Sequence, residues 1–246
     1  MLSKAKLWLS LAVGTLLMWS TGAHAAWELN MPRGVTQISR DTYDLHMTIF
    51  WWMIAIGVVV FGVLLWSIIN HRKSKGAKPA SFHESTKVEI VWTLIPFLIL
   101  IAMAVPATRV LTAAYDASAS DLDIQITGYQ WRWEYSYLPQ SADEEEVSFF
   151  STLATSREEI SNSMEKSENY LLEVDNPLVI PTDRKVRFLM TSADVLHAWW
   201  VPEFAIKKDN VPGFINESWV IVEEPGIYRG QCAELCGMDH VFMPLN

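Results

Sequence analysis

The two cysteines of this 246-residue chain lie close together near its end, in a run that also holds a histidine and a methionine. Cys232 and Cys236 are followed by His240 and Met243, at steps of four and then three residues. Thiolate, thioether and imidazole groups form a soft ligand set, which suits copper. A second imidazole, that of His197, lies upstream in the segment Val-Leu-His-Ala-Trp-Trp. The residue types and their spacing therefore predict a copper site.

A disulfide between Cys232 and Cys236 is the alternative that the cysteines alone would favour. The chain carries the signals of an exported protein, and the compartments that receive such proteins oxidise thiols. A disulfide, however, does not require a histidine and a methionine at fixed steps beyond the second cysteine. The whole pattern therefore favours a metal site.

This pattern resembles the dinuclear copper site, called CuA, of the cytochrome c oxidase subunit 2 family. The resemblance implies that two thiolates bridge two copper ions and that each ion also takes one imidazole. It implies further that a thioether binds one ion and a backbone carbonyl the other. The implied ligands are His197, Cys232, the carbonyl of Glu234, Cys236, His240 and Met243. The resemblance extends along nearly the whole chain, through residues 88–96, 128–135 and 172–177.

The same resemblance implies roles for other residues. Trp131 would receive the electron from cytochrome c, although without the resemblance it reads as a core residue. The carboxylate of Glu234 would bind a magnesium ion shared with subunit 1, since a hard carboxylate suits this cation. Glu89, at the inner end of a predicted helix, would mark the entrance of a proton path. Asp194 would support the docking region or the ligand loop, and Arg132 is a basic departure within an otherwise acidic docking face.

The first 113 residues contain three apolar segments. Residues 1–25 read as a secretory signal, with an early positive charge and a small-residue cleavage site; the alternative is an uncleaved helix. Within 26–113, two uncharged runs predict membrane-spanning helices at about 45–70 and 90–111. The loop between them holds the basic residues Arg72, Lys73, Lys75 and Lys78. Short basic loops remain cytoplasmic, so both ends of the mature chain would face outward.

Residues 114–246 form a predicted outer domain with a strongly acidic composition. It holds 23 acidic and 9 basic residues, a net charge of −14. This sign disfavours nucleic acid and suits a basic protein partner. Alternating apolar residues predict short strands, which indicate a sandwich or barrel, and the resemblance implies a cupredoxin-like Greek-key barrel. The predicted strands are 121–127, 131–137, 171–174, 179–180, 186–190, 219–222 and 227–229. Residues 141–168 are predicted to be a surface loop with room for a short helix in its Ser/Glu-rich part.

The resemblance implies the electron-entry subunit of a respiratory cytochrome c oxidase. It would accept electrons from cytochrome c and pass them to haem in subunit 1, where oxygen reduction is coupled to proton pumping; this chain itself would not hold the oxygen-reducing site. Its partners would be subunit 1, subunit 3, cytochrome c and the lipid bilayer. It would reside in a bacterial inner membrane, with the copper domain on the periplasmic side. The alternatives are a copper-free quinol oxidase subunit, a CuA domain of an enzyme such as nitrous oxide reductase, and a copper-delivery protein.

Overall fold

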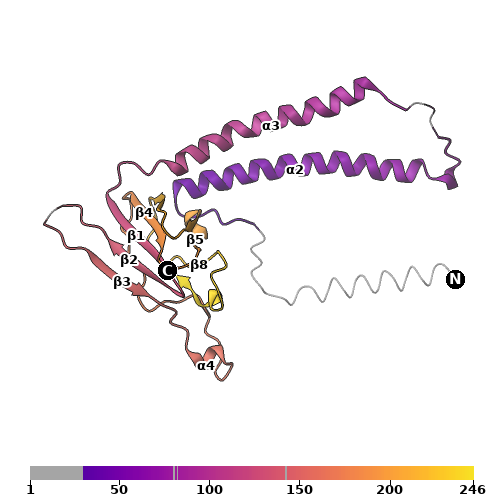
Figure 1. Cartoon of the computed structure of the whole chain (residues 1–246). Coiled ribbons are helices and arrows are strands. Elements are labelled where there is room, and N and C mark those ends of the chain that lie inside the picture. The colour runs from indigo at the N-terminus through magenta and orange to yellow at the C-terminus, as the bar shows by residue number, and fades with distance from the viewer. Residues whose placement is uncertain (1–29, 80, 82, 142) are drawn as a thin grey trace. The chain divides into compact units, whose positions relative to one another are not determined.

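The computed structural model describes residues 30–79, 81, 83–141 and 143–246, and the predicted secretory signal lies outside them. Two long helices come first, α2 (Gln37–Asn70) and α3 (Thr86–Tyr115), joined through the short helix η2 (Lys73–Lys75) (Figure 1). Both are long and apolar enough to cross a membrane. The chain therefore begins its described part with a helical hairpin that can span a bilayer.

Each helix is longer than the uncharged run that predicted it. Helix α2 begins at Gln37, because Thr36 caps it: the Oγ1 of Thr36 accepts from the backbone N–H of Ser39 at 2.9 Å, and Ser39 Oγ accepts from Thr36 N–H at 3.0 Å. This reciprocal pair satisfies two of the N–H groups that a helix start leaves unpaired. Helix α3 begins at Thr86 and continues to Tyr115. Charged residues limit the part of a helix that can lie in the hydrocarbon of the membrane. Capping hydrogen bonds decide the residue at which the helix itself begins.

The strands of the outer domain form two sheets. The first has the order β3-β2-β1-β4-β7 and the second the order β6-β5-β8-β9. Strands β1 and β4 run parallel, whereas the other paired strands are antiparallel. The bounds are β1 Leu122–Tyr129, β2 Arg132–Tyr137, β3 Val147–Ser151, β4 Val186–Ser192, β5 His197–Val201, β6 Ile206–Asn210, β7 Asn216–Val220, β8 Gly230–Cys232 and β9 Pro244–Leu245. The predicted fold class, a helical hairpin followed by an all-β cupredoxin-like domain, is confirmed.

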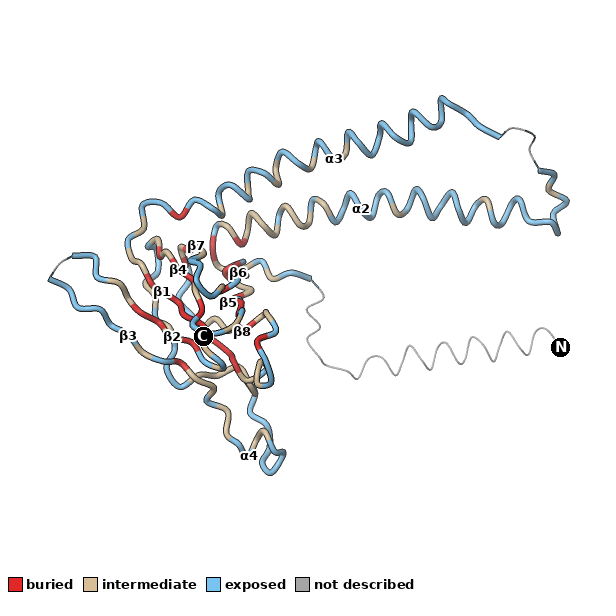
Figure 2. Tube along the Cα trace, in the orientation of Figure 1, coloured by how far each residue is buried: buried red, intermediate tan, exposed pale blue. Residues whose placement is uncertain are grey.

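The core lies between the two sheets. Strand β4 alternates strictly between buried and half-buried residues, and its inward side chains meet the second sheet, as Phe188 does against Trp199 at 5.1 Å between ring centroids. In Figure 2 the buried residues gather in this domain, while α3 has none. The apolar surface of α3 is therefore left for lipid or for other membrane helices.

Several predicted strands are wrong. Residues 171–174 and 227–229 carry no strand, and 179–180 lie in an irregular segment. Strand β3 instead lies inside the predicted loop 141–168, where it pairs with β2, and the short helix α4 (Arg157–Ile160) follows it. An edge strand needs only one neighbour, so β3 forms beside β2 although the charged run before it suggested a loop.

Both membrane helices are bonded to the outer domain. Arg40 in α2 makes two hydrogen bonds of 2.7 Å to the carboxylate of Glu223. At the end of α3, the indole N–H of Trp219 donates to the carbonyl oxygen of Ala113 at 3.2 Å, and the ammonium of Lys185 lies 4.4 Å from the centre of the same indole. These contacts attach the domain to the outer ends of the hairpin.

Candidate metal centre

The second sheet brings the predicted metal-ligand residues together. His197 is the first residue of β5 and Cys232 the last of β8, and the two strands pair with Trp199 opposite Cys232. The loop after β8 carries Cys236 and His240 and returns through Met243 to β9. The N–H of Cys232 donates to the carbonyl oxygen of Met243 at 3.0 Å, which closes the base of this loop.

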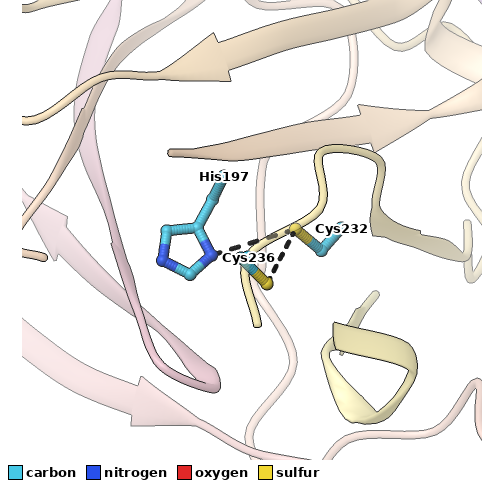
Figure 3. A group of neighbouring side chains, drawn as sticks. All are labelled: His197, Cys232 and Cys236. Atoms are coloured by element: carbon cyan, nitrogen blue, oxygen red, sulfur yellow. Dashed lines mark hydrogen bonds between the residues drawn. The ribbon is translucent and has the colours of Figure 1, made fainter. Parts of the chain in front are cut away.

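Each cysteine sulfur faces one imidazole. The Sγ of Cys232 lies 3.9 Å from Nδ1 of His197, and the Sγ of Cys236 lies 3.4 Å from Nδ1 of His240. The two sulfurs are 3.8 Å apart, so both residues are free thiols and the disulfide alternative does not describe this structure. In Figure 3 the side chains of His197, Cys232 and Cys236 point toward one another, and their ligand atoms lie within 4.8 Å of each other.

The other two predicted ligand residues, Glu234 and Met243, both contact Cys232. The carbonyl oxygen of Glu234 is 3.4 Å from the Sγ of Cys232. Met243 is buried in the same cluster as both cysteines, and its thioether is therefore a donor within the dry interior. The imidazoles of His197 and His240 and the carbonyl of Glu234 thus lie within 3.9 Å of a cysteine sulfur. Met243 is joined to Cys232 through its backbone carbonyl.

Both cysteines and the first histidine are buried, and this histidine is held in one orientation. His197 has no exposed surface, and Cys236 and Cys232 expose 2% and 6% of theirs. The Nε2 of His197 lies 2.9 Å from Oδ1 of Asp194, so an N–H at Nε2 donates to this carboxylate and leaves the lone pair of Nδ1 aimed at the sulfur. Metal-binding histidines are commonly oriented by a carboxylate in this way.

The absence of a side chain at Gly128 leaves space for the imidazole of His197. A Cβ at Gly128 would lie 2.7 Å from Cδ2 of the ring, which is closer than real side chains approach. The ring also packs edge-to-face with Trp133, with the ring centroids 5.9 Å apart. The imidazole is therefore fixed by packing as well as by its hydrogen bond.

The two thiols have very different acidities. Burial raises the pKa of the Cys232 thiol, but hydrogen bonds outweigh it and lower this pKa to about 7; the first of them is the one that His197 donates from Nδ1 when its ring carries both protons, before a metal replaces that proton. At Cys236, burial and the negative charge of the Cys232 thiolate raise the pKa to about 12. One thiolate therefore forms readily and opposes the second. A bound cation removes that opposition, because metal coordination deprotonates thiols. The donor set thus fits a soft metal ion.

Comparisons with known proteins identify the family. The family model described as cytochrome c oxidase subunit II, periplasmic domain, matches residues 122–246, and the model of the subunit II transmembrane domain matches residues 24–110. The chain belongs to the cytochrome c oxidase subunit 2 family. The periplasmic model covers every residue of the candidate metal centre, and the transmembrane model covers most of both long helices.

Two individual relatives and one solved structure of this family resemble the chain. A probable cytochrome c oxidase subunit 2 of Rickettsia felis is 36% identical over 247 residues, which cover 98% of this chain and 76% of the relative. A cytochrome c oxidase subunit 2 of Arabidopsis thaliana is 36% identical over 221 residues, 89% of this chain and 83% of the relative. The crystal structure of the periplasmic domain of subunit II of cytochrome oxidase from Bradyrhizobium japonicum has 39% sequence identity, with a TM-score of 0.44, and covers 52% of this chain and 83% of that one.

Trp131, which is predicted from the sequence to be the electron-entry residue, contacts the loop after β8. It lies in the turn between β1 and β2, just before β2, and is half-buried. Its indole Nε1–H donates to the carbonyl oxygen of Cys236 at 3.2 Å. The neighbouring Arg132 is turned away, with its guanidinium 4.0 Å from the centre of the Phe150 ring.

Glu89 is not part of the metal cluster. It lies exposed in the first turn of α3, at the end of the helix remote from Tyr115. A helix of this length measures about 45 Å, so the full helix separates Glu89 from the outer domain. The structure places Glu89 in a shallow depression along α3 with Thr86, Ile90, Thr93, Leu94 and Phe97.

Sequence reasoning assigned no role to Gln130. Its side-chain Nε2 donates to the carbonyl oxygen of Cys236 at 2.8 Å, closer than the indole of Trp131 does. Its only signal in the sequence is its place immediately before Trp131. A polar residue in an exposed turn carries no periodicity, so only the fold could reveal the contact.

Proposed function

We propose that this chain is the electron-entry subunit of a cytochrome c oxidase. It takes electrons from cytochrome c at a dinuclear copper centre and passes them to haem in subunit 1, where oxygen is reduced and protons are pumped. The observation that carries the proposal is the pair of buried thiols 3.8 Å apart, each facing the Nδ1 of its own histidine. A quinol oxidase subunit without copper would have no use for this set.

In this proposal the chain would hold two copper ions. Cys232 and Cys236 would supply the thiolates, His197 and His240 one imidazole each, Met243 the thioether and Glu234 the carbonyl. Copper held by such a soft ligand set would supply one-electron transfer. The proposal is supported by the burial of both cysteines and of Met243, which keeps these three sulfur-bearing side chains out of contact with water.

The residues around the ligands supply rigidity. Asp194 holds the imidazole of His197, and the hydrogen bond from Cys232 N–H to Met243 closes the ligand loop. A ligand shell that is already in place needs little rearrangement when an electron arrives. The chain's own contribution is therefore a dry and preorganised site.

Trp131 is the proposed entry point for the electron. Its indole is half-buried and is bonded to the backbone of Cys236 at 3.2 Å. The excess of acidic residues in 114–246, a net charge of −14, favours approach by a basic cytochrome c. The indole thus connects a partially open surface with a ligand of the centre.

Two further sites belong to the proposal. The carboxylate of the half-buried Glu234 would bind a magnesium ion shared with subunit 1, because this hard cation prefers oxygen ligands. Glu89 would lie at the entrance of a proton path on the cytoplasmic side. A third subunit would complete the core of the assembly.

The proposed location is a bacterial inner membrane. Helices α2 and α3 would span it, and the four basic residues between them would stay in the cytoplasm. Residues 1–25 would be removed as a signal, so that the domain 114–246 works in the periplasm.

The experiment is a stopped-flow measurement of electron entry. The full chain assembled with its oxidase is mixed with reduced cytochrome c, and the reduction of the copper centre is followed. Trp131→Ala should slow this step strongly, whereas Trp200→Ala, which removes another partly exposed indole, should leave it nearly unchanged. A wild-type assembly whose copper is not reduced by cytochrome c would refute the proposal.

A further inference from the structure

Gln130 touches both chain segments that carry the candidate ligands. Its backbone N–H donates to Oδ2 of Asp194 at 2.7 Å, beside His197. Its side-chain Nε2 donates to the carbonyl oxygen of Cys236 at 2.8 Å, within the loop that holds the thiols. The two bonded residues are 64 and 106 positions away in the sequence. One residue of the β1–β2 turn thus joins two otherwise separate parts of the centre.

The bond to Asp194 ties the turn to a ligand. The carboxylate of Asp194 is shared: Oδ2 accepts from Gln130 and Oδ1 lies 2.9 Å from Nε2 of His197. Moving the turn would therefore move the group that orients the imidazole. Because this bond uses the backbone of Gln130, a change of its side chain leaves it in place.

The bonds to Cys236 fix the peptide group of a thiol ligand. Its carbonyl oxygen accepts from both Gln130 and Trp131, at 2.8 and 3.2 Å. The next residue is Gly237, with φ +119°, and a Cβ there would lie 2.9 Å from Nε2 of Gln130 and 3.1 Å from Cζ2 of Trp131. The loop can approach the two donors this closely only with glycine at that position.

We infer that Gln130 is a positioning residue of the copper centre, which holds the backbone of Cys236 against the indole of Trp131 and so keeps the electron entry in contact with a ligand. The inference rests on the proposed function. The indole alone offers the carbonyl oxygen a single donor. The amide of Gln130 adds a second donor. The two donors together fix the direction of the Cys236 carbonyl group and the position of the Trp131 indole.

A role in packing alone gives a different expectation. Gln130→Glu keeps the size and shape of the side chain but replaces the N–H donor by a carboxylate oxygen, which cannot donate when ionised. Gln130→Leu removes both polar atoms. If the hydrogen bond matters, both variants disturb the centre. If only packing matters, Gln130→Glu behaves as the wild type does.

The matched control is Gln140→Leu. Gln140 also is an exposed glutamine whose Nε2 donates to a main-chain oxygen, that of Leu138 at 3.2 Å, but it lies in the loop after β2, away from the metal cluster. Its loss removes the same kind of bond from the same domain. Any difference between Gln130→Leu and Gln140→Leu therefore comes from the position of the lost hydrogen bond beside the metal cluster.

The test uses the full chain assembled with its oxidase, as wild type, Gln130→Leu, Gln130→Glu and Gln140→Leu. Copper per chain, the electron paramagnetic resonance spectrum and the rate of copper loss to an excess of chelator are measured. Partners of metal ligands are typically worth 10- to 100-fold in affinity or activity, so both Gln130 variants should lose copper about 10- to 100-fold faster, with altered copper hyperfine splitting. In Gln130→Leu, the KM for cytochrome c should remain unchanged while electron entry slows.

The outcomes separate the inference from the function it rests on. Copper loss and spectra like those of Gln140→Leu in either Gln130 variant would overturn it. So would failure of both Gln130 variants to assemble when Gln140→Leu assembles, because a positioning residue is not needed for folding. A wild-type assembly without a copper pair would instead refute the proposed function.

Discussion

Asp194 accepts a hydrogen bond from Nε2 of His197 at 2.9 Å, while Nδ1 of the same ring faces the sulfur of Cys232 at 3.9 Å. Burial raises the pKa of the Asp194 carboxyl, but hydrogen bonds, first that from His197, outweigh it and lower this pKa. The carboxylate therefore stays charged and keeps the proton on Nε2. The ring is preset to offer Nδ1 to a metal.

Asp194→Ala should weaken copper binding by about 10- to 100-fold, because the imidazole of His197 loses the partner that orients it. The measurement is a competition titration of the full chain with a copper chelator. Asp143→Ala, an exposed acid in the loop before β3, is the control that changes the charge equally. Equal affinities of the two variants would contradict the role given to Asp194.

Cys232→Ser and Met243→Leu should have different effects. Cys232→Ser removes a bridging sulfur and should abolish the spectrum of an electron shared by two coppers. Met243→Leu removes a thioether and keeps a side chain of similar size in a buried position, so copper should remain while the spectrum and the potential shift. Electron paramagnetic resonance with a copper count measures both, and an unchanged spectrum in Cys232→Ser would show that the ligand assignment is wrong.

Gly237→Ala should destabilise the ligand loop. The new Cβ would lie 2.9 Å from Nε2 of Gln130, and the backbone angle of +119° is one that alanine rarely adopts. The cost of such strain is about 1 to 3 kcal/mol, to which the contact adds. Gly213→Ala is the control, since Gly213 also has a positive φ but no atom within 4 Å of its Cβ position. If thermal unfolding shows the same loss for both, the contacts with Gln130 and Trp131 contribute nothing.

The ion pair between Asp123 and Arg187 should make stability depend on pH. The hydrogen bond with Arg187 lowers the pKa of Asp123 below its ordinary 3.8, so the pair stabilises the fold above that value. This stabilisation is lost as the pH falls through the lowered pKa of the folded state. Asp123→Asn should therefore cost about 1 kcal/mol at pH 7 and progressively less in acid. Melting curves of the detergent-solubilised chain at several pH values measure this, and a constant difference would contradict it.

The candidate ligand cluster could be predicted from the sequence, because Cys232, Cys236, His240 and Met243 lie within twelve residues and all have side chains that commonly bind metals. The second sheet that holds them could not. Strand β6 reads Ile-Lys-Lys-Asp-Asn, without an alternating pattern, and β8 has three residues. Such strands form because their neighbours pair with them, which local sequence does not record.

Gln130 shows the same limit at a single residue. Its bond to Cys236 spans 106 positions, and nothing near Gln130 in the sequence indicates it. The apolar run of α2 gave the membrane span, whereas its start at Gln37 depends on the capping pair of Thr36 and Ser39. Composition therefore predicts what an element faces, and specific contacts decide where it begins and what it touches.

The most direct test of the dinuclear copper centre is a copper count together with the electron paramagnetic resonance spectrum of the purified full chain. Two coppers per chain, with hyperfine structure from one electron shared equally between them, is the predicted result. A single copper with the spectrum of an isolated ion, or a chain whose two cysteines take up no copper, would contradict the account.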